Sequence, residues 1–312
     1  MRLSAIVLIC VVLFVSVFFS GCAQQADVGL KFEPGDKSAY KVTHSSGKSY
    51  RFEQPSQDKV KDKNTDRRLE MVLSQKVDRV IEDGAAIVDV TVEEVKYYFK
   101  GPEGVQQDFD STVPTKRTGE FARIAGKSYR IKLNKDGRAE VINSSEVSGA
   151  CKGQFCSWVF NKENIAERHS ITALPKDKTV VKTGDSWTEV VGSPGSMLQA
   201  KTYEKVYTLE KVYQEGGSKL AVISMKALPT SKQPEEQTSS QQGAMGFFSK
   251  MFDSQDVYTG KIIMNLDTGR VKKYHEKLDA EWVATEQSSG GDGMDVLKMG
   301  YTDSFTMKLL KR

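Results

Sequence analysis

The sequence is poor in histidine and cysteine, the residues that most often ligate metals or serve as nucleophiles. Its only three histidines are His44, His169 and His275, and no two of them have the spacing of a metal-ligating pair. It also lacks a Gly-x-Ser-x-Gly elbow, a His-Glu-x-x-His helix, a phosphate-binding glycine loop and a Cys–His couple. We therefore expect no catalytic residue, no metal and no cofactor.

An excess of either charge is also absent. The chain has 45 Lys and Arg residues against 41 Asp and Glu residues, a formal net charge of +4. Nucleic-acid-binding proteins need a strongly basic surface, whereas a mixed surface of this kind serves ordinary solubility. We expect no nucleic-acid partner.

Charge is missing altogether from residues 3–19, which follow the short basic start Met1-Arg2. An apolar run between a basic start and the small pair Ser20-Gly21 is typical of a secretory signal peptide. The alternative is an uncleaved membrane anchor, although this run is at the short end of what spans a bilayer. Because Cys22 follows the small pair directly, the site resembles the bacterial lipobox, in which the cysteine carries the lipid.

This resemblance implies an address for the rest of the chain. Residues 1–21 would be removed as a lipoprotein signal peptide, and acylated Cys22 would anchor the protein to a membrane of the cell envelope. Ala23 is not the Asp that retains many lipoproteins in the inner membrane, which favours an outer membrane and a periplasmic position. We expect residues 22–29 to be a tether.

Two further cysteines, Cys151 and Cys156, lie in the sequence CKGQFC. A close pair in an exported protein most simply forms a disulfide. The alternatives are a redox pair or a metal site, but redox pairs favour a shorter spacing, and a zinc site needs more ligands nearby. We predict a disulfide with a Cα–Cα distance of roughly 4.4–6.8 Å.

Most of the mature chain alternates apolar and polar residues with the period of a β-strand. In residues 69–99 two such runs flank an Asp-Gly turn, and a second pair flanks Asp136-Gly137. In the strand IVDVTVEEV we expect Val88, Val90 and Val92 to face the core, because burying Asp89 without a partner costs several kcal/mol.

Two similar hairpins recur later, turning at residues 215–217 and at Asp267-Thr268-Gly269. Their order suggests a duplication, although hairpins look alike in general. We expect a mainly β protein: antiparallel curved sheets or an incomplete barrel, in two similar halves, with one or two short helices. The first β half would span residues 30–150 and the second 181–312, joined by a helical connector at residues 151–180.

Several turn and strand-start motifs are similar to those of an uncharacterised β-rich domain found in bacterial lipoproteins and exported proteins. The similarity extends from about Leu30 to the C-terminus. That family has no assigned activity, so the resemblance implies a fold and an exported location but no chemistry. The motifs are LKFEPGD at residues 30–36, GKSY at 126–129, VKTGDSW at 181–187 and DTGRV at 267–271.

Aromatic side chains in or near the strands are the remaining candidates for a binding site. In a curved sheet they could line an apolar cavity, but aromatic residues in strands more often fill the core. The candidates are Tyr97, Phe99, Trp187, Tyr203, Tyr207 and Trp282.

These observations favour a membrane-anchored, non-enzymatic module that binds an unknown protein or apolar ligand or serves as a scaffold. The second hypothesis is a carrier of lipid or another apolar ligand in a β cavity. An uncharacterised envelope enzyme is the third.

Overall fold

The computed structural model describes residues 24–176, 178–194, 197, 201–233, 253–287 and 293–311. The predicted signal peptide and Cys22 lie outside these ranges, so lipid attachment stays a prediction. Among the described residues, no helix is both long and apolar enough to cross a bilayer.

The dominant element is one antiparallel sheet of 12 strands. Its order is β7-β6-β4-β3-β2-β14-β13-β12-β11-β10-β9, and β5 pairs with β4 beside this path. The strands are β2 (Lys37–Gln54), β3 (Lys59–Val80), β4 (Ala86–Gly101), β5 (Gly104–Asp110), β6 (Ser128–Leu133), β7 (Ala139–Asn143), β9 (Ser186–Gly192), β10 (Thr202–Glu215), β11 (Ser218–Thr230), β12 (Asp253–Asn265), β13 (Arg270–Gln287) and β14 (Met294–Leu309).

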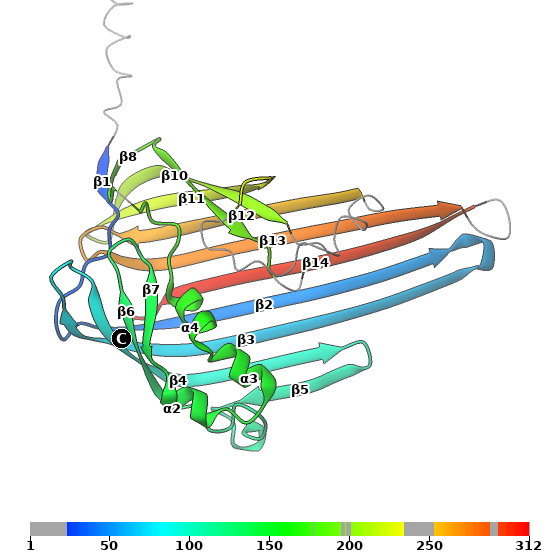
Figure 1. Ribbon diagram of the computed structural model, residues 1–312, viewed down its shortest axis with the longest axis horizontal. Coiled ribbons are helices and arrows are strands. Elements are labelled where there is room, and N and C mark those ends of the chain that lie inside the picture. The colour runs from blue at the N-terminus through cyan, green and yellow to red at the C-terminus, as the bar shows by residue number, and fades with distance from the viewer. Residues whose placement is uncertain are drawn as a thin grey trace, which may run out of the picture.

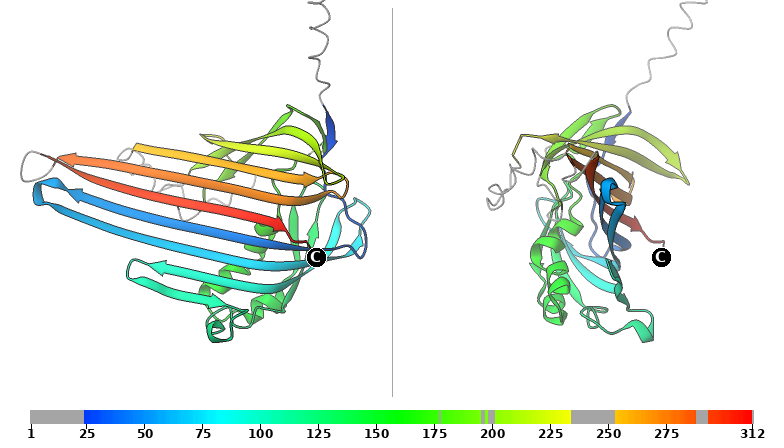
Figure 2. Two further views of the ribbon diagram at one scale, coloured as in Figure 1. Left: turned by 180° about the vertical axis from the view of Figure 1, so that it is seen from behind. Right: turned by 90° about the vertical axis from the view of Figure 1, so that its right-hand side faces the viewer.

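This sheet confirms the expected mainly β fold with an open, curved sheet. Its first and last strands, β7 and β9, do not pair with each other, so the sheet does not close. The central strands are long and extend well beyond the helices (Figure 1). Seen from the end, the sheet is curved, with the helices on one face and the C-terminus on the other (Figure 2). We call these the helix face and the open face.

Three short helices lie on the helix face: α2 (Ser145–Ala150), α3 (Gln154–Val159) and α4 (Lys162–His169). This is one more than the sequence predicted, because residues 145–150 continued the β pattern in our interpretation. Asn161 caps the N-terminus of α4, where its side-chain oxygen accepts a hydrogen bond from the Asn164 backbone N–H at 2.7 Å. Ile165 and His169 of α4 are buried against the sheet.

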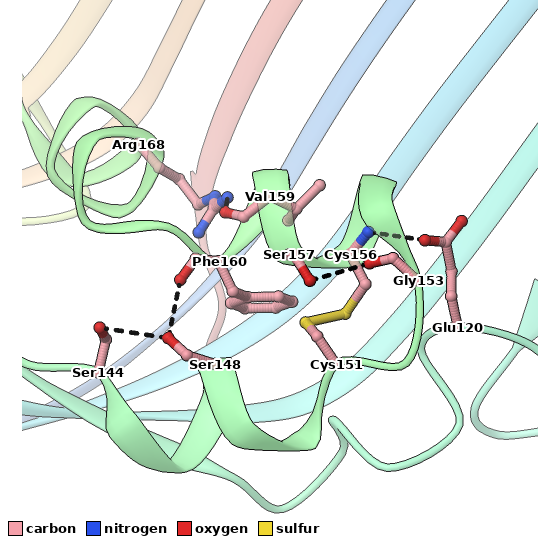
Figure 3. The surroundings of a disulfide bond; sticks show 10 residues. All are labelled: Glu120, Ser144, Ser148, Cys151, Gly153, Cys156, Ser157, Val159, Phe160 and Arg168. Carbon is pink, nitrogen blue, oxygen red and sulfur yellow. Dashed lines mark hydrogen bonds between the residues drawn. A yellow bond between two sulfur atoms is a disulfide. The ribbon is translucent and has the colours of Figure 1, made fainter.

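The predicted disulfide between Cys151 and Cys156 is confirmed, with a Cα–Cα distance of 5.4 Å. It links the end of α2 to α3 (Figure 3). The Glu120 carboxylate accepts a hydrogen bond from the Cys156 backbone N–H at 2.8 Å, at the first turn of α3. The bridge therefore joins the two short helices and fixes them over the sheet.

The register predicted for β4 is also confirmed. Val88, Val90 and Val92 are buried on the helix face, with exposures of 2%, 0% and 0%. Asp89 points to the open face, where its carboxylate accepts hydrogen bonds from Arg130 Nε at 2.7 Å and Nη2 at 3.0 Å. A one-residue slip would bury that ion pair and expose the valines.

The two predicted halves share one sheet. In each half the two hairpins lie side by side in chain order, β3-β4-β6-β7 and β10-β11-β12-β13. The turns at Asp136-Gly137 and Thr268-Gly269 both use a glycine with positive φ, 85° and 61°. This order is the one that a duplication predicts, and common ancestry stays a hypothesis.

Residues 22–29 were expected to be a tether, but their described part, from residue 24, is packed against the rest of the protein. Residues Gln25–Asp27 form β1, which pairs antiparallel with β8 (Val180–Lys182). Ala26 and Val28 are buried, with exposures of 3% and 0%. The alternation of Ala26 and Val28 with polar neighbours was too short to indicate a strand from sequence.

Candidate binding groove

The six candidate aromatic residues form two groups that lie far apart across the sheet. Tyr97 and Phe99 belong to β4, whereas the other four belong to β9, β10 and β13. Tyr97, Tyr203, Tyr207 and Trp282 are almost completely buried, and Phe99 and Trp187 are half-buried. The structure therefore packs them in the core or at its margin.

The first group packs under α3. The Tyr97 ring lies 4.7 Å from the ring of Phe155 and 5.3 Å from the ring of Phe121. The Arg67 guanidinium lies 5.1 Å from the Phe99 ring and 4.6 Å from the Phe155 ring, in cation–π contact with both. These side chains join the helix to the sheet.

Two strands of the second group, β10 and β13, also carry a buried ion pair. Lys205 Nζ on β10 donates to Glu276 Oε2 on β13 at 2.8 Å, and the Tyr258 hydroxyl donates to the same oxygen at 3.0 Å. The Tyr274 hydroxyl donates to Glu276 Oε1. Burial alone would lower the pKa of Lys205, but the Glu276 carboxylate more than offsets this and holds the pKa above its ordinary value.

Small residues let this ion pair span the two strands that separate β10 from β13. Ala227 of β11 is the partner of Lys205, and Gly260 of β12 is the partner of Glu276. A Cβ at Gly260 would meet the Glu276 Cγ at 3.1 Å. Most of the polar atoms that converge here bind one another, as in a structural network of a core. The Tyr207 hydroxyl and Glu189 Oε2, which lie near the same ion pair, have no hydrogen-bond partner within the described part of the chain.

A large hollow lies instead on the open face. It is a groove of about 1270 Å³, at the end of the sheet where β14 ends. Its floor includes the half-buried side chains of Ile263, Leu310 and Tyr213. None of the six aromatic candidates lines it.

The border of this groove is strongly basic. Among the described residues that line it, only Asp89 and Glu215 are acidic. The cationic lining residues are Lys37, Lys76, Arg270, Lys272, Lys273, Lys308 and Lys311. The sequence alone does not distinguish these lysines, because they lie in or next to ordinary amphipathic hairpins. The antiparallel pairing of β2 with both β3 and β14 places the start of β2 beside the ends of those two strands.

A second hollow, of about 50 Å³, lies on the helix face beneath α4. Its lining includes His169, Gln75 and Tyr40. This space has room for a water molecule or two. It is far too small for a lipid.

Exposed apolar side chains do not form a second candidate surface. Among the described residues, the exposed large apolar residues are divided among eight strands and helices. They are Tyr50, Val60, Val105, Ile142, Trp158, Leu228, Val257 and Met294. Leu228 and Val257 lie side by side, directly beyond the paired residues Ala227 and Tyr258, but two side chains do not make a large patch. Single exposed apolar residues of this kind are normal in soluble domains.

Comparison with known proteins gives only distant structural similarity. No protein-family model matches the chain, and no curated protein matches it. Lipovitellin, in a structure of its lipid–protein interactions, is 12% identical over 90% of this chain and 26% of its own, with a TM-score of 0.44. OpdQ of Pseudomonas aeruginosa is 9% identical over 88% of this chain and 100% of its own, with a TM-score of 0.17. The attachment invasion locus protein Ail of Yersinia pestis is 7% identical over 89% of this chain and 100% of its own, with a TM-score of 0.10.

Proposed function

We propose that this chain is a non-enzymatic carrier or binding protein for an apolar ligand, anchored in the cell envelope through Cys22. The observation that carries the ligand proposal is the groove of about 1270 Å³ on the open face, with its apolar floor. Typical small-molecule sites have volumes of roughly 300–1,000 Å³, so a lipid-sized ligand has room here. The anchor is supported by the sequence of residues 1–22 alone.

The position of the groove favours a carrier over a scaffold. A scaffold needs a continuous exposed apolar patch, whereas the exposed apolar residues described here belong to eight different elements, with no more than the pair Leu228 and Val257 placed side by side by the strand register. Ile263, Leu310 and Tyr213 line the groove while keeping part of their surface accessible. A hydrocarbon chain laid along them would remove that surface from water and gain about 25 cal/mol for each Å² buried.

Binding of a fluorescent fatty acid to the purified, lipid-stripped full chain tests this proposal. We expect binding, and we expect Ile263→Glu to weaken it by about tenfold or more, because a carboxylate on the floor must be desolvated by the tail. Val257→Glu is the matched control: Val257 lies on the same strand and face, is exposed and is outside the groove lining. Equal affinities of the two variants, or no binding by the natural chain, would contradict the proposal.

A further inference from the structure

The lining of the groove specifies the chemistry of its ligand. We propose that the groove binds an amphiphile with an anionic headgroup, held by lysines of β13 and β14, with its tail on the apolar floor. This proposal deepens the proposed function and rests on it.

Lysines face one another directly across two strand pairs of the groove. Lys273 of β13 is the Cα partner of Lys308 of β14, and Lys37 of β2 is the Cα partner of Lys76 of β3. All four side chains are exposed. Like charges directly opposite each other destabilise a sheet. An anion bound between them would offset that repulsion.

The carboxylates around the groove have other partners. Arg130 binds Asp89 through two hydrogen bonds, although Lys76 lies opposite Asp89 in the sheet. Lys272 forms an ion pair with Glu215 at 2.9 Å. Arg270 is held by Asp36 at 2.8 Å.

The opposed lysines themselves remain available. Within the described residues, Lys273 and Lys308 form no ion pair with a carboxylate. Lys37 and Lys76 form no such ion pair either, although Lys76 lies opposite Asp89 and its charge, after that of Arg130, helps to lower the pKa of this carboxyl. The charges of Lys273 and Lys308 are therefore directed at solvent and at whatever enters the groove.

The apolar floor begins next to the lysines. Ile263 of β12 is the Cα partner of Lys273, so one row across three strands runs from an isoleucine to two lysines. Leu310 follows β14 on the same side, where its backbone N–H donates to the Ala39 carbonyl at 2.8 Å. Cationic groups beside an apolar strip fit a phosphate or carboxylate that carries a hydrocarbon tail. A free inorganic anion would leave the strip exposed, so the proposal commits to a lipid headgroup.

Two amphiphiles with the same twelve-carbon tail separate the headgroup from the tail: dodecyl phosphate, which is anionic, and monododecanoylglycerol, which is neutral. Binding to the full chain is measured by calorimetry below the micelle concentration. We expect Lys273→Gln/Lys308→Gln to weaken dodecyl phosphate binding by about tenfold or more, because charge-assisted hydrogen bonds are lost. Binding of the neutral glyceride should change by less than about twofold, because its tail contacts remain.

The matched control is Lys277→Gln/Lys298→Gln. Both lysines are exposed on the same strands and the same face, outside the groove lining. This double variant should bind both amphiphiles as the natural chain does. Millimolar inorganic phosphate should not displace dodecyl phosphate, since it lacks a tail.

Each contrary result has one meaning. If neither amphiphile binds the natural chain, the proposed function itself fails. If both bind equally and Lys273→Gln/Lys308→Gln changes nothing, apolar binding stands and the anionic headgroup is wrong. If inorganic phosphate displaces dodecyl phosphate efficiently, the lysines form a simple anion site and the amphiphile proposal is overturned.

Discussion

His169, the last residue of α4, is a neutral imidazole held between two polar neighbours on the sheet. Its Nδ1 lies 3.3 Å from the Gln75 amide nitrogen, and its Nε2 lies 2.6 Å from the Tyr129 hydroxyl oxygen. Since an amide nitrogen can only donate, Nδ1 accepts that bond and Nε2–H donates to Tyr129. Burial, together with the nearby Arg168 charge, lowers the pKa of His169 to about 3. Protonation at Nδ1 would place two donors face to face.

This geometry predicts acid sensitivity with a defined range. Unfolded histidine has a pKa of about 6.5, so the unfolded chain binds a proton that the folded chain refuses. The neutral His169 therefore contributes to the free energy of unfolding fully above about pH 6.5. This contribution is lost as the pH falls towards 3, by up to about 1.4 kcal/mol per pH unit. Urea unfolding at several pH values should give a shallower decline for His169→Gln than for the natural chain. Identical slopes would show that His169 titrates freely.

Lys273 and Lys308 show what a single sequence leaves undetermined at this scale. Both alternate with apolar residues in the sequence, and nothing local distinguishes them from the lysines of any solvated strand face. Asp89 is the opposite case. The cost of burying its charge determined the register of its strand, and the structure gives it Arg130 on the open face.

Among the elements, strands, their turns and the helical segment that holds α3 and α4 were predictable, whereas α2 and the exact bounds of the helices were not. Asp-Gly turns with alternating flanks gave the hairpins, because turn chemistry and period are both local signals. The three helices have 6, 6 and 8 residues, too few for a clear helical period. β1 has only 3 residues and depends on β8, which is more than 150 residues away in the chain.

The disulfide of α3 gives a prediction at this scale. Closing so short a loop restricts the unfolded chain modestly, by about 2 kcal/mol in the chain-entropy account. Reductant should therefore lower the free energy of unfolding of the natural chain by about that amount. Cys151→Ala/Cys156→Ala should start at the lower value and not respond to reductant. A response to reductant in that variant would assign the effect to another group.

On the scale of the whole molecule, the decisive feature is one continuous sheet built from both halves of the chain. β2 and β14 pair along their length, with Lys41 opposite Lys308, which joins the start of the first half to the end of the second. Such a pairing of distant strands has no local sequence signal. The alternating pattern and the turns made the fold class predictable. The groove depends on this pairing of distant strands and was therefore not predictable. The aromatic candidates were found in the core because the long helix-face rows of the sheet needed large side chains to fill them.

The most direct test of the central claim is to locate the ligand on the chain. A twelve-carbon fatty acid with a diazirine at the end of its tail is bound to the full chain, activated by light and mapped by peptide mass spectrometry. The account predicts attachment to the strands of the groove: the C-terminal part of β12 around Ile263, the start of β13 and the end of β14. Attachment confined to residues of the helix face, such as those of α3 and α4, would place the ligand on the opposite side of the sheet and contradict it.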